Sequence, residues 1–428
     1  MLLAIPSLLF SMAMAADWPQ WRGPTSDGIS AETNPPTRWS RTENIAWKAP
    51  LSGLGTSTPI VSRDHVYVTL QIGDGPFDGR SHDFENASVA RRAGETDQVR
   101  FAVEAYHRLS GKLAWAYTFA AEGRLPPVHI KHNLASPSCV TDGERVYAWF
   151  GTGHLIALDR GGKLVWKRHL GVDVAPYDVM WGHGSSPTLY KDSLLLLGDH
   201  PPGAYLVALD SRTGQERWRK DRGKEKRSYT TPLVVRLAGK DELIINSSER
   251  VDAVDPATGE LLWYVGEPNR VPVPTPVFHD GIVYLNRGYS SSPYLAVKAG
   301  GKGDAAPRVV WEQKTGGPYV SSVLYYRGLI YMANERGIVS VVDAANGELV
   351  WRDRFGGLFS ASPVAADGKV YLVNEEGETF VLAAGREKRI LERNRLDERI
   401  LASPAISDGQ IFLRSDQSLY SIGAPRQP

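Results

Sequence analysis

The chain repeats one short phrase along most of its length, and this repeat constrains the fold more than any other feature. "VVDAANGELVW" at 341–351 has relatives in "VALDSRTGQERW" at 207–218, "DAVDPATGELLW" at 252–263 and "IALDRGGKLVW" at 156–166. In each, an aspartate is followed by a glycine and then by a tryptophan at nearly fixed distances. A phrase that recurs every roughly 40 to 50 residues indicates a series of similar structural units.

A second landmark precedes each phrase. It is a serine or threonine followed by proline, at Thr58, Ser136, Ser186, Thr231, Thr275, Ser362 and Ser403, with Ser322 before a valine in the remaining copy. The landmarks therefore define eight copies. We expect each hydroxyl to satisfy backbone groups where a strand begins at a crowded centre. A ring of hydroxyls that binds a ligand is the alternative.

Between the landmarks lie alternating apolar runs such as "DGKVYLVNEEGETFVLAA" at 367–384, with a glycine turn between them. Runs of this length, rich in β-branched and aromatic residues, indicate short strands at hairpin spacing. Four strands in about 40 residues is the size of one propeller blade. The sequence therefore predicts an all-β protein, an eight-bladed β-propeller with four antiparallel strands per blade.

The eighth copy, "SDGQIFLRSDQSLYSIG" at 407–423, ends before its last strand. The missing piece stands at the other end of the chain, where "ENIAWKAPL" at 43–51 resembles "GKLVWKRHL" at 162–170. We expect this N-terminal strand to complete the last blade, which closes the ring and removes free sheet edges at the junction.

The repeated phrase has a structural role. The aspartate accepts hydrogen bonds from nearby backbone N–H groups and the glycine supplies a positive φ, so the phrase forms the hairpin between the third and fourth strands. The tryptophan is a large flat group suited to packing between neighbouring blades. The expected blade-corner residues are Trp47, Trp115, Trp166, Trp218, Trp263, Trp311 and Trp351, with Leu391 in the seventh copy.

The pattern "A/V-x-D-x-x-T-G-x-x-x-W", as it stands at 208–218 and 253–263, resembles the pyrroloquinoline-quinone (PQQ) type repeat of a family of eight-bladed propellers. The resemblance covers roughly residues 40 to 422. The start "DWPQWRGPTSDGIS" is also similar to the opening of exported PQQ-like repeat proteins. The family implies two functions: one branch contains quinoprotein dehydrogenases, and another contains the outer-membrane assembly factor BamB, a non-catalytic scaffold.

Composition narrows the classes of partner. The formal net charge of +1 argues against a nucleic-acid-binding groove, which normally carries a basic excess. One cysteine, Cys139, excludes an intramolecular disulfide and a thiolate metal cluster, and its apolar surroundings favour a buried structural thiol.

The N-terminal residues 1–16 form a short apolar run that ends in small residues, which indicates a secretory signal peptide. We therefore expect a periplasmic or secreted monomer without a transmembrane segment. Its parts are a signal peptide at 1–16, an N-terminal extension at 17–42, the propeller at 43–422 and a tail at 423–428. The polar stretch 73–100 is expected to be a surface loop, either solvated or a docking arm with Arg91 and Arg92 facing a partner.

The candidate site follows from the topology. Loops that leave an outer strand and enter the next inner strand converge around the central channel of a propeller. These loops place ten candidate residues at one funnel mouth: His132, Asn133, Trp181, His183, Arg227, Tyr229, Arg270, Tyr319, Phe359 and Arg399. Ordinary loop packing is the alternative for all of them. His129, His132 and His183 form a further hypothesis, a three-histidine metal site.

The expected function is that of an exported binding scaffold in the cell envelope, without catalysis, for a protein partner or a small ligand at the funnel. The alternative is a PQQ-dependent dehydrogenase-like quinoprotein. The resemblance implies that such enzymes hold Ca²⁺ with carboxylate and Asn ligands, use an Asp base and often carry a disulfide between adjacent cysteines. This chain has no cysteine pair, and Asp178, Glu225, Asp397 and Glu398 are the nearest carboxylates. We therefore expect neither PQQ nor a metal as a cofactor.

Overall fold

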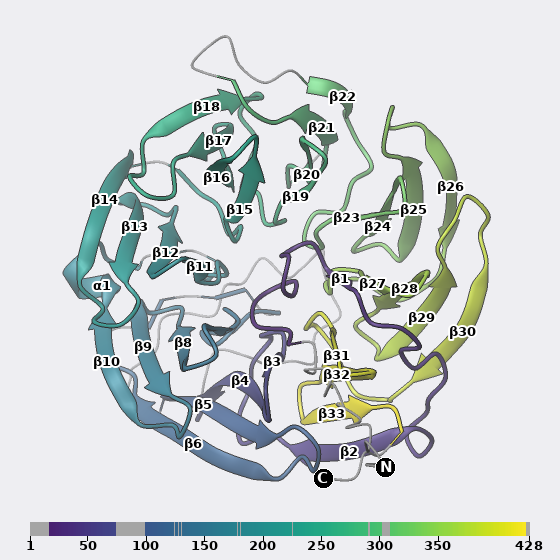
Figure 1. The fold of residues 1–428 in the computed structure, drawn as a ribbon, viewed down its shortest axis with the longest axis horizontal. Helices are drawn as coiled ribbons and strands as arrows, with labels where there is room; N and C mark the ends of the chain where they lie inside the picture. Colours follow the sequence, from purple (N-terminus) through teal and green to yellow (C-terminus); the bar gives the residue numbers. More distant parts are fainter. Residues whose placement is uncertain are drawn as a thin grey trace, which may run out of the picture.

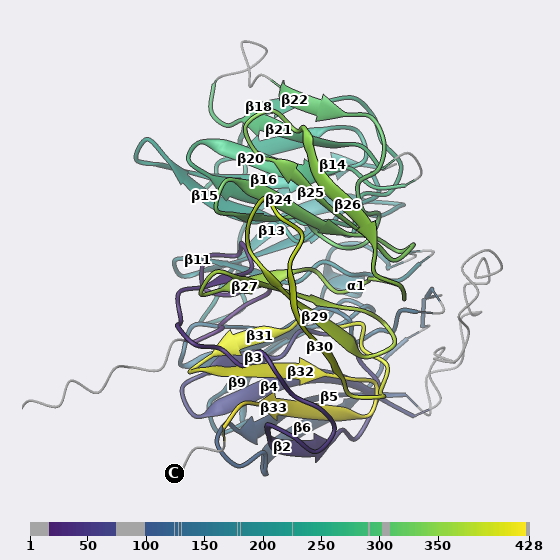
Figure 2. The same ribbon diagram turned by 90° about the vertical axis from the view of Figure 1, so that its right-hand side faces the viewer.

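The computed structural model describes residues 17–73 and 99–424, apart from positions 124, 127, 130, 178, 180, 225, 290, 291 and 302–308. The expected signal peptide, Arg91, Arg92 and most of the 73–100 loop lie outside these residues. The described chain forms eight sheets arranged around a centre, which confirms the eight-bladed propeller (Figure 1). Figure 2 shows the disc from its edge, so that the strands run from one face to the other.

Each blade is an antiparallel sheet whose strands follow one another from the centre outward. The first blade consists of β3(Ile60–Ser62), β4(His65–Ile72), β5(Arg100–His107) and β6(Leu113–Ala120), and the second of β7(Val140–Thr141), β8(Arg145–Trp149), β9(His154–Asp159) and β10(Leu164–His169). The third consists of β11(Thr188–Tyr190), β12(Ser193–Gly198), β13(Ala204–Asp210) and β14(Glu216–Gly223), and the fourth of β15(Leu233–Leu237), β16(Lys240–Asn246), β17(Val251–Val254) and β18(Leu261–Val265). A single short helix, α1(Leu170–Asp173), is described in the connection that follows β10.

The other four blades complete the ring. The fifth consists of β19(Val277–His279), β20(Ile282–Asn286), β21(Tyr294–Lys298) and β22(Val309–Gln313), and the sixth of β23(Leu324–Tyr326), β24(Leu329–Ala333), β25(Ile338–Asp343) and β26(Leu349–Arg354). The seventh consists of β27(Val364–Ala366), β28(Lys369–Val373), β29(Glu378–Ala383) and β30(Ile390–Arg395), and the eighth of β31(Ala405–Ser407), β32(Gln410–Arg414), β33(Ser418–Ile422) and β2(Ile45–Pro50). The N-terminal strand β2 pairs antiparallel with β33, with Ile45 opposite Ile422 and Pro50 opposite Ser418. This pairing confirms the predicted closure of the ring.

The repeated glycine and tryptophan meet across neighbouring blades. Gly214 has a φ of 69°, and a Cβ added to it would lie 2.8 Å from the Trp166 ring of the preceding blade. The Trp166 Nε1–H donates to the Ser211 carbonyl of the same turn at 2.9 Å. Four further pairs have the same close approach: Gly111 with Trp47, Gly162 with Trp115, Gly259 with Trp218 and Gly347 with Trp311. In these five corners the phrase recurs because the glycine turn of one blade packs against the tryptophan of the preceding blade.

Two corner tryptophans have other surroundings. Trp263 is fully buried and donates to Glu242 Oε2 at 2.8 Å within its own blade. Trp351 stacks on Phe355 at a centroid distance of 6.3 Å. The sequence lacks the Asp-to-Gly phrase at the corresponding places of the following copies, 298–308 and 384–389.

A belt of hydrogen bonds joins the inner strands of adjacent blades. In seven steps a backbone N–H donates to the hydroxyl oxygen of the next blade, at 2.9 to 3.3 Å, from Thr58 through Ser138, Ser186, Thr231, Thr275, Ser322 and Ser362 to Ser403. The belt confirms for six of the eight expected hydroxyls that they satisfy backbone groups: Ser186, Thr231, Thr275, Ser322, Ser362 and Ser403. The expectation is wrong for Thr58, whose backbone N–H donates to Ser138 but whose own buried hydroxyl has no hydrogen-bond partner.

One member of the belt was predicted incorrectly from the sequence. Ser138 occupies the position expected for Ser136, because the strand of the second blade begins two residues later than its Ser-Pro pair indicates. Ser136 instead donates to the Asn133 carbonyl at 2.8 Å. Cys139, next to Ser138, is buried, and burial raises the pKa of its thiol to about 12.

The segment that the sequence treats as an N-terminal extension crosses the centre of the ring (Figure 1). Trp18 forms a backbone bridge to Val61 of the first blade, and β1(Ile29–Ser30) pairs in parallel with β27 as a fifth strand of the seventh blade. Between them, Trp21 Nε1 donates to Thr275 Oγ1 at 3.1 Å and Arg22 Nη2 donates to the Val323 carbonyl at 2.9 Å. Residues 17–30 therefore plug the channel at the end where the first and second strands of each blade turn.

Candidate functional site

The opposite end of the channel carries the loops that enter each inner strand, together with the turns between the second and third strands. We call this side the loop face. All ten predicted funnel residues belong to loops of this face, because an antiparallel blade places every such connection at the same end.

A buried ion pair spans the loop face. Lys131 follows the first blade and Glu375 lies in the seventh, yet Lys131 Nζ is 2.7 Å from Glu375 Oε2, with side-chain exposures of 7% and 1%. Ser360 Oγ donates to Glu375 Oε1 at 2.6 Å, and Arg399 Nη2 lies 3.8 Å from Glu375 Oε2. The loop that carries Lys131 is therefore tied to the far side of the channel mouth.

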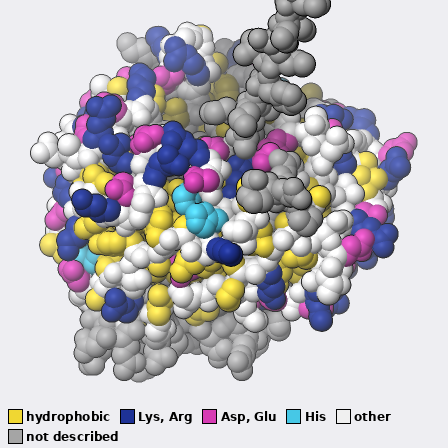
Figure 3. All heavy atoms as spheres, turned by 60° about the horizontal axis from the view of Figure 1, so that its bottom comes forward, with side chains coloured by type: hydrophobic (Ala, Val, Ile, Leu, Met, Phe, Trp, Pro, Cys, Tyr) yellow, Lys and Arg dark blue, Asp and Glu magenta, His cyan; other side chains and the backbone are white. Residues whose placement is uncertain are grey.

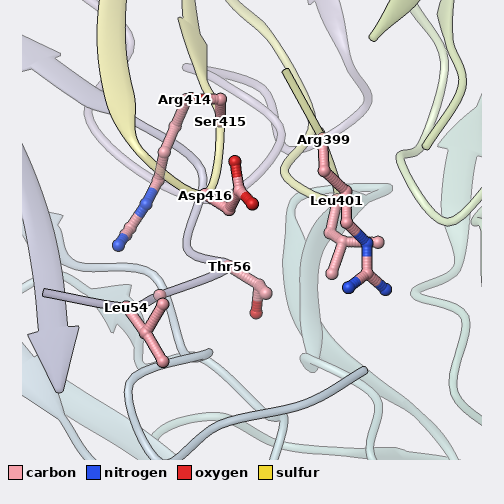
Figure 4. Close-up of a pocket in the computed structure, with 8 residues that line it drawn as sticks. Leu54, Thr56, Arg399, Leu401, Arg414, Ser415 and Asp416 are labelled. Atoms are coloured by element: carbon pink, nitrogen blue, oxygen red, sulfur yellow. The ribbon is translucent and has the colours of Figure 1, made fainter. Parts of the chain in front are cut away.

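Beside this pair is a small, open pocket at the junction of the last and first blades. In Figure 4, Asp416 lies between Arg414 and Arg399, and Leu54 and Thr56 form the wall opposite. Arg414 is buried and donates to Ser57 Oγ at 2.6 Å and to the Thr69 carbonyl at 2.7 Å. Burial lowers the pKa of Arg414 to about 10 and raises that of the Asp416 carboxyl.

The four predicted residues of the second and third blades belong to a packed aromatic region. His183 is buried with its ring 4.1 Å from that of Trp149, and burial holds its pKa well below the ordinary value. Burial also lowers the pKa of His132 to about 4. Trp181 contacts His129 edge-to-face at 5.8 Å, and buried Asn133 accepts from the Ala135 N–H at 2.8 Å. These contacts are those of loop packing.

A second group of predicted residues forms a more exposed surface. Arg270 is exposed, with its guanidinium 5.8 Å from the Tyr289 ring centre, and the rings of Tyr289 and Tyr319 are 5.4 Å apart. Tyr289 is 48% exposed, whereas burial raises the pKa of Tyr319 to about 12. Tyr229 lies close enough to Tyr319 and to exposed Arg227 for both to influence its pKa, which burial raises. We call Arg227, Tyr229, Arg270, Tyr289 and Tyr319 the Tyr–Arg patch.

The remaining predicted residues lie apart from this patch. Phe359 is 1% exposed and packs on Phe380 at 6.2 Å, so it belongs to the core between the sixth and seventh blades. Arg399 forms part of the pocket of Figure 4 and faces Glu375.

Sequence reasoning missed Tyr289, Glu375 and the plug. The first two stand in turns between second and third strands, whereas only the inter-blade loops were considered. Both kinds of connection emerge on the same face of an antiparallel blade, and this rule could have found them.

The described residues do not assemble the groups that PQQ and its metal ion would need. No cluster of three or more His, Cys, Asp or Glu side chains able to hold a metal occurs in the described ranges, so the three-histidine hypothesis has no support there. The pocket of Figure 4 is lined by Arg, Thr, Ser, Leu, Gly and a single carboxylate, without an aromatic face for a planar quinone. Ca²⁺ requires several oxygen ligands. Two carboxylates named from the sequence, Asp178 and Glu225, lie outside the described residues.

Comparison with known proteins gives one family and several structural relatives. The family model described as "Outer membrane protein assembly factor BamB" matches residues 100–333, 297–387 and 335–424. BamB from Moraxella catarrhalis has 16% sequence identity and a TM-score of 0.55, covering 76% of this chain and 90% of that chain. Quinohemoprotein alcohol dehydrogenase from Comamonas testosteroni has 11% identity and a TM-score of 0.67, covering 96% and 82%. At these identities the likeness shows the fold alone.

One curated relative has an enzyme's name. Tetrathionate hydrolase from Acidithiobacillus ferrooxidans is 24% identical over 339 residues, which are 72% of this chain and 61% of the relative. The chain thus spans about three fifths of that protein's length. Separately, no helix in the described part of the chain is both long and apolar enough to cross a membrane.

Proposed function

The chain belongs to the family of the outer membrane protein assembly factor BamB, whose members are PQQ-like repeat β-propellers, and on this premise we propose that it is an exported, non-catalytic scaffold of the cell envelope. The proposed binding surface is the loop face. The proposed partner is a protein segment that carries carboxylates and an apolar side chain.

The observation that carries this proposal is the Tyr–Arg patch. Arginine and tyrosine are the residues that most often dominate the binding energy of protein interfaces, because they combine large contact area with hydrogen bonds. Arg227 and Arg270 are exposed, and 48% of Tyr289 is open to solvent. An acidic segment would pair its carboxylates with the guanidinium groups and lay its apolar atoms on the tyrosine rings.

The channel supports binding on the surface more than reaction in the interior. The plug fills one end, and the Lys131–Glu375 pair ties loops together at the other. A rigid ring with loops from several blades held around its mouth is a platform on which partner residues can be positioned.

A photo-crosslinking experiment in the native host tests the scaffold function. Tyr289 is replaced with a benzoyl-phenylalanine, and Arg327, an exposed residue in the turn after β23, receives the same group as the matched control. We expect position 289 to crosslink one envelope protein and position 327 not to do so. The crosslink should disappear in R227E/R270E. Equal crosslinking at both positions, or none at position 289, would reject the proposal.

Export is tested separately. We expect the chain recovered from the periplasmic or secreted fraction to begin at Asp17, where the small residues of the apolar run end. A chain that keeps residues 1–16 and stays in the cytoplasm would contradict the proposed location.

The alternative function is a PQQ-dependent dehydrogenase-like quinoprotein. It requires Trp181, Arg227, Arg270 and Tyr319 to surround a flat anionic group, with arginine on its carboxylates and a ring on its face. In the structure Trp181 packs on His129, whereas Arg270 and Tyr319 belong to the Tyr–Arg patch. We therefore derive no reaction step through PQQ.

A calorimetric and absorbance titration decides between the two functions. The chain from Asp17 is titrated with PQQ in the presence of Ca²⁺, and separately with tetrathionate, the compound in the curated relative's name. The scaffold predicts no saturable heat and no spectral change in either titration. Saturable PQQ binding that R270A abolishes, accompanied by dye reduction with alcohols or sugars, would establish the quinoprotein instead.

A further inference from the structure

The outer strand β6 of the first blade has an unusual composition for a sheet edge. Its sequence is LAWAYTFA, eight residues without a charge or a proline, and none of them is buried. In the described sheet β6 pairs only with β5, so one row of its backbone N–H and C=O groups faces outward. Edge strands of this kind invite pairing with another strand unless charges or proline protect them.

The other outer strands are protected. β10, β14, β22, β26, β30 and β2 each contain at least one charged residue, and β2 also ends in Pro50. Only β18 resembles β6 in lacking charges, but it has five residues, and the Arg250 guanidinium lies 3.8 Å from the centre of its Tyr264 ring. Among the described outer strands, β6 is therefore the longest without a charge or a proline.

The surface around β6 is apolar. Leu113 is 52% exposed, and Trp115, Tyr117 and Phe119, which pack against the core with part of each side chain, are partly exposed along the strand. Figure 3 brings this side of the disc, the lower side of Figure 1, toward the viewer and shows hydrophobic side chains gathered in a band across it.

The two ends of β6 carry opposite charges. Lys112 precedes the strand and Glu122 follows it, both are exposed, and neither forms an ion pair with another described residue. They are ten positions apart, about 33 Å along an extended strand, so they cannot pair within one chain. If a second copy pairs antiparallel with Tyr117 opposite Tyr117, each Lys112 lies opposite the Glu122 of the other copy. In the same register Trp115 lies opposite Phe119.

We propose that β6 is the dimer interface of this protein: two copies pair antiparallel along β6, joining their first blades into one continuous sheet across a two-fold axis. Such an interface is self-complementary, as two-fold symmetry requires. Aromatic pairs and the two terminal ion pairs set its register. It lies on the rim and leaves the loop face of both copies open, so it is independent of the proposed scaffold function. It differs from the sequence-based expectation of a monomer, and sedimentation decides between the two.

Sedimentation velocity on the chain from Asp17 to Pro428 tests the proposal across micromolar concentrations. We expect the wild type to form a dimer that dissociates on dilution. A116K, which places a charge in the middle of β6, should raise the dissociation constant at least tenfold. L349K is the matched control, because Leu349 begins the outer strand β26 and is 53% exposed. It should sediment like the wild type.

A charge-swap cycle then tests the register. K112E and E122K should each raise the dissociation constant several-fold at low salt, because each sets like charges against each other at both ends of the interface. The double variant K112E/E122K should restore it, since it exchanges the two ends. Circular dichroism checks that each variant is folded. A wild type that is monomeric at every concentration, a dimer that L349K weakens as much as A116K, or a double variant that is not restored would each overturn the proposal.

Discussion

Lys131 Nζ and Glu375 Oε2 lie 2.7 Å apart across the channel mouth, although the two residues come from loops 244 positions apart in the chain. Both side chains are almost fully buried. Burial removes the water that would stabilise each charge, so each charge is stabilised by the other instead. The change in unfolding free energy on removing one partner measures this.

The first prediction concerns this pair. K131M leaves the Glu375 carboxylate buried without its ammonium partner, although Ser360 still donates to it and Arg399 lies 3.8 Å away, so the free energy of unfolding should fall by about 3 kcal/mol. K131M/E375Q should recover most of that loss, because the side chain at position 375 then carries no buried charge. Urea unfolding of the wild type and the variants measures both values. A double variant as unstable as K131M alone would show that the charge has no role.

The second prediction concerns the blade corners. G214A should be more destabilising than G239A, although both glycines have positive φ values, 69° and 81°. At Gly239 nothing lies within 4 Å of an added Cβ, so only the left-handed backbone costs energy, about 1 kcal/mol. At Gly214 the new methyl group would also meet Trp166 at 2.8 Å, which adds about 1–3 kcal/mol of overpacking. If urea unfolding shows the same loss of unfolding free energy in both variants, the Trp166 ring moves away from the added methyl group at no cost.

The third prediction concerns the plug. Deleting 17–30 removes the contacts that Trp18, Trp21 and Arg22 make with three blades and the pairing of β1 with a fourth, while β2 can still close the ring. At about 1 kcal/mol per hydrogen bond, the loss should exceed 3 kcal/mol. Calorimetry should therefore show a lower melting temperature with a single transition retained. W21F, which removes only one indole N–H, serves as the control with a loss near 1 kcal/mol. An unchanged melting temperature would make the segment a passive tail.

The fold could be predicted because its determinants are local and repeated. Short stretches of sequence contain all of them: a turn that needs a positive φ at glycine, a tryptophan that packs at a blade corner, and a hydroxyl at the inner strand. The missing last strand also pointed to its replacement near Trp47. Ser136 was misplaced because Ser-Pro was taken as the landmark, whereas the hydroxyl that binds the neighbouring backbone is Ser138.

The site was less predictable because its contacts join distant parts of the chain. Nothing near Lys131 in the sequence indicates Glu375, and nothing near Trp21 indicates Thr275. The topology could place residues on a face, and all ten funnel candidates do belong to the loop face. It could not separate His183 and Phe359, which pack inward, from Arg270 and Tyr319, which join the exposed patch, because that depends on side-chain packing.

The last prediction concerns pH. Burial lowers the pKa of His132 to about 4 and that of His154 to about 3, and it holds the pKa of His183 well below its ordinary value. In the unfolded chain these imidazoles titrate near 6.5, so well above that pH they are neutral in both states and add no pH dependence to the stability. As the pH falls from 6.5 toward 4, these imidazoles bind protons in the unfolded chain but stay neutral in the folded chain. The free energy of unfolding must therefore decrease. Urea unfolding at pH 7.5, 6.0 and 5.0 should show this decline. H132Q should make this decline smaller, because it removes one of the three buried imidazoles. If the wild type keeps the same stability at pH 5.0 as at 7.5, these histidines already carry their protons in the folded chain, and the packed region around Trp149 must admit water.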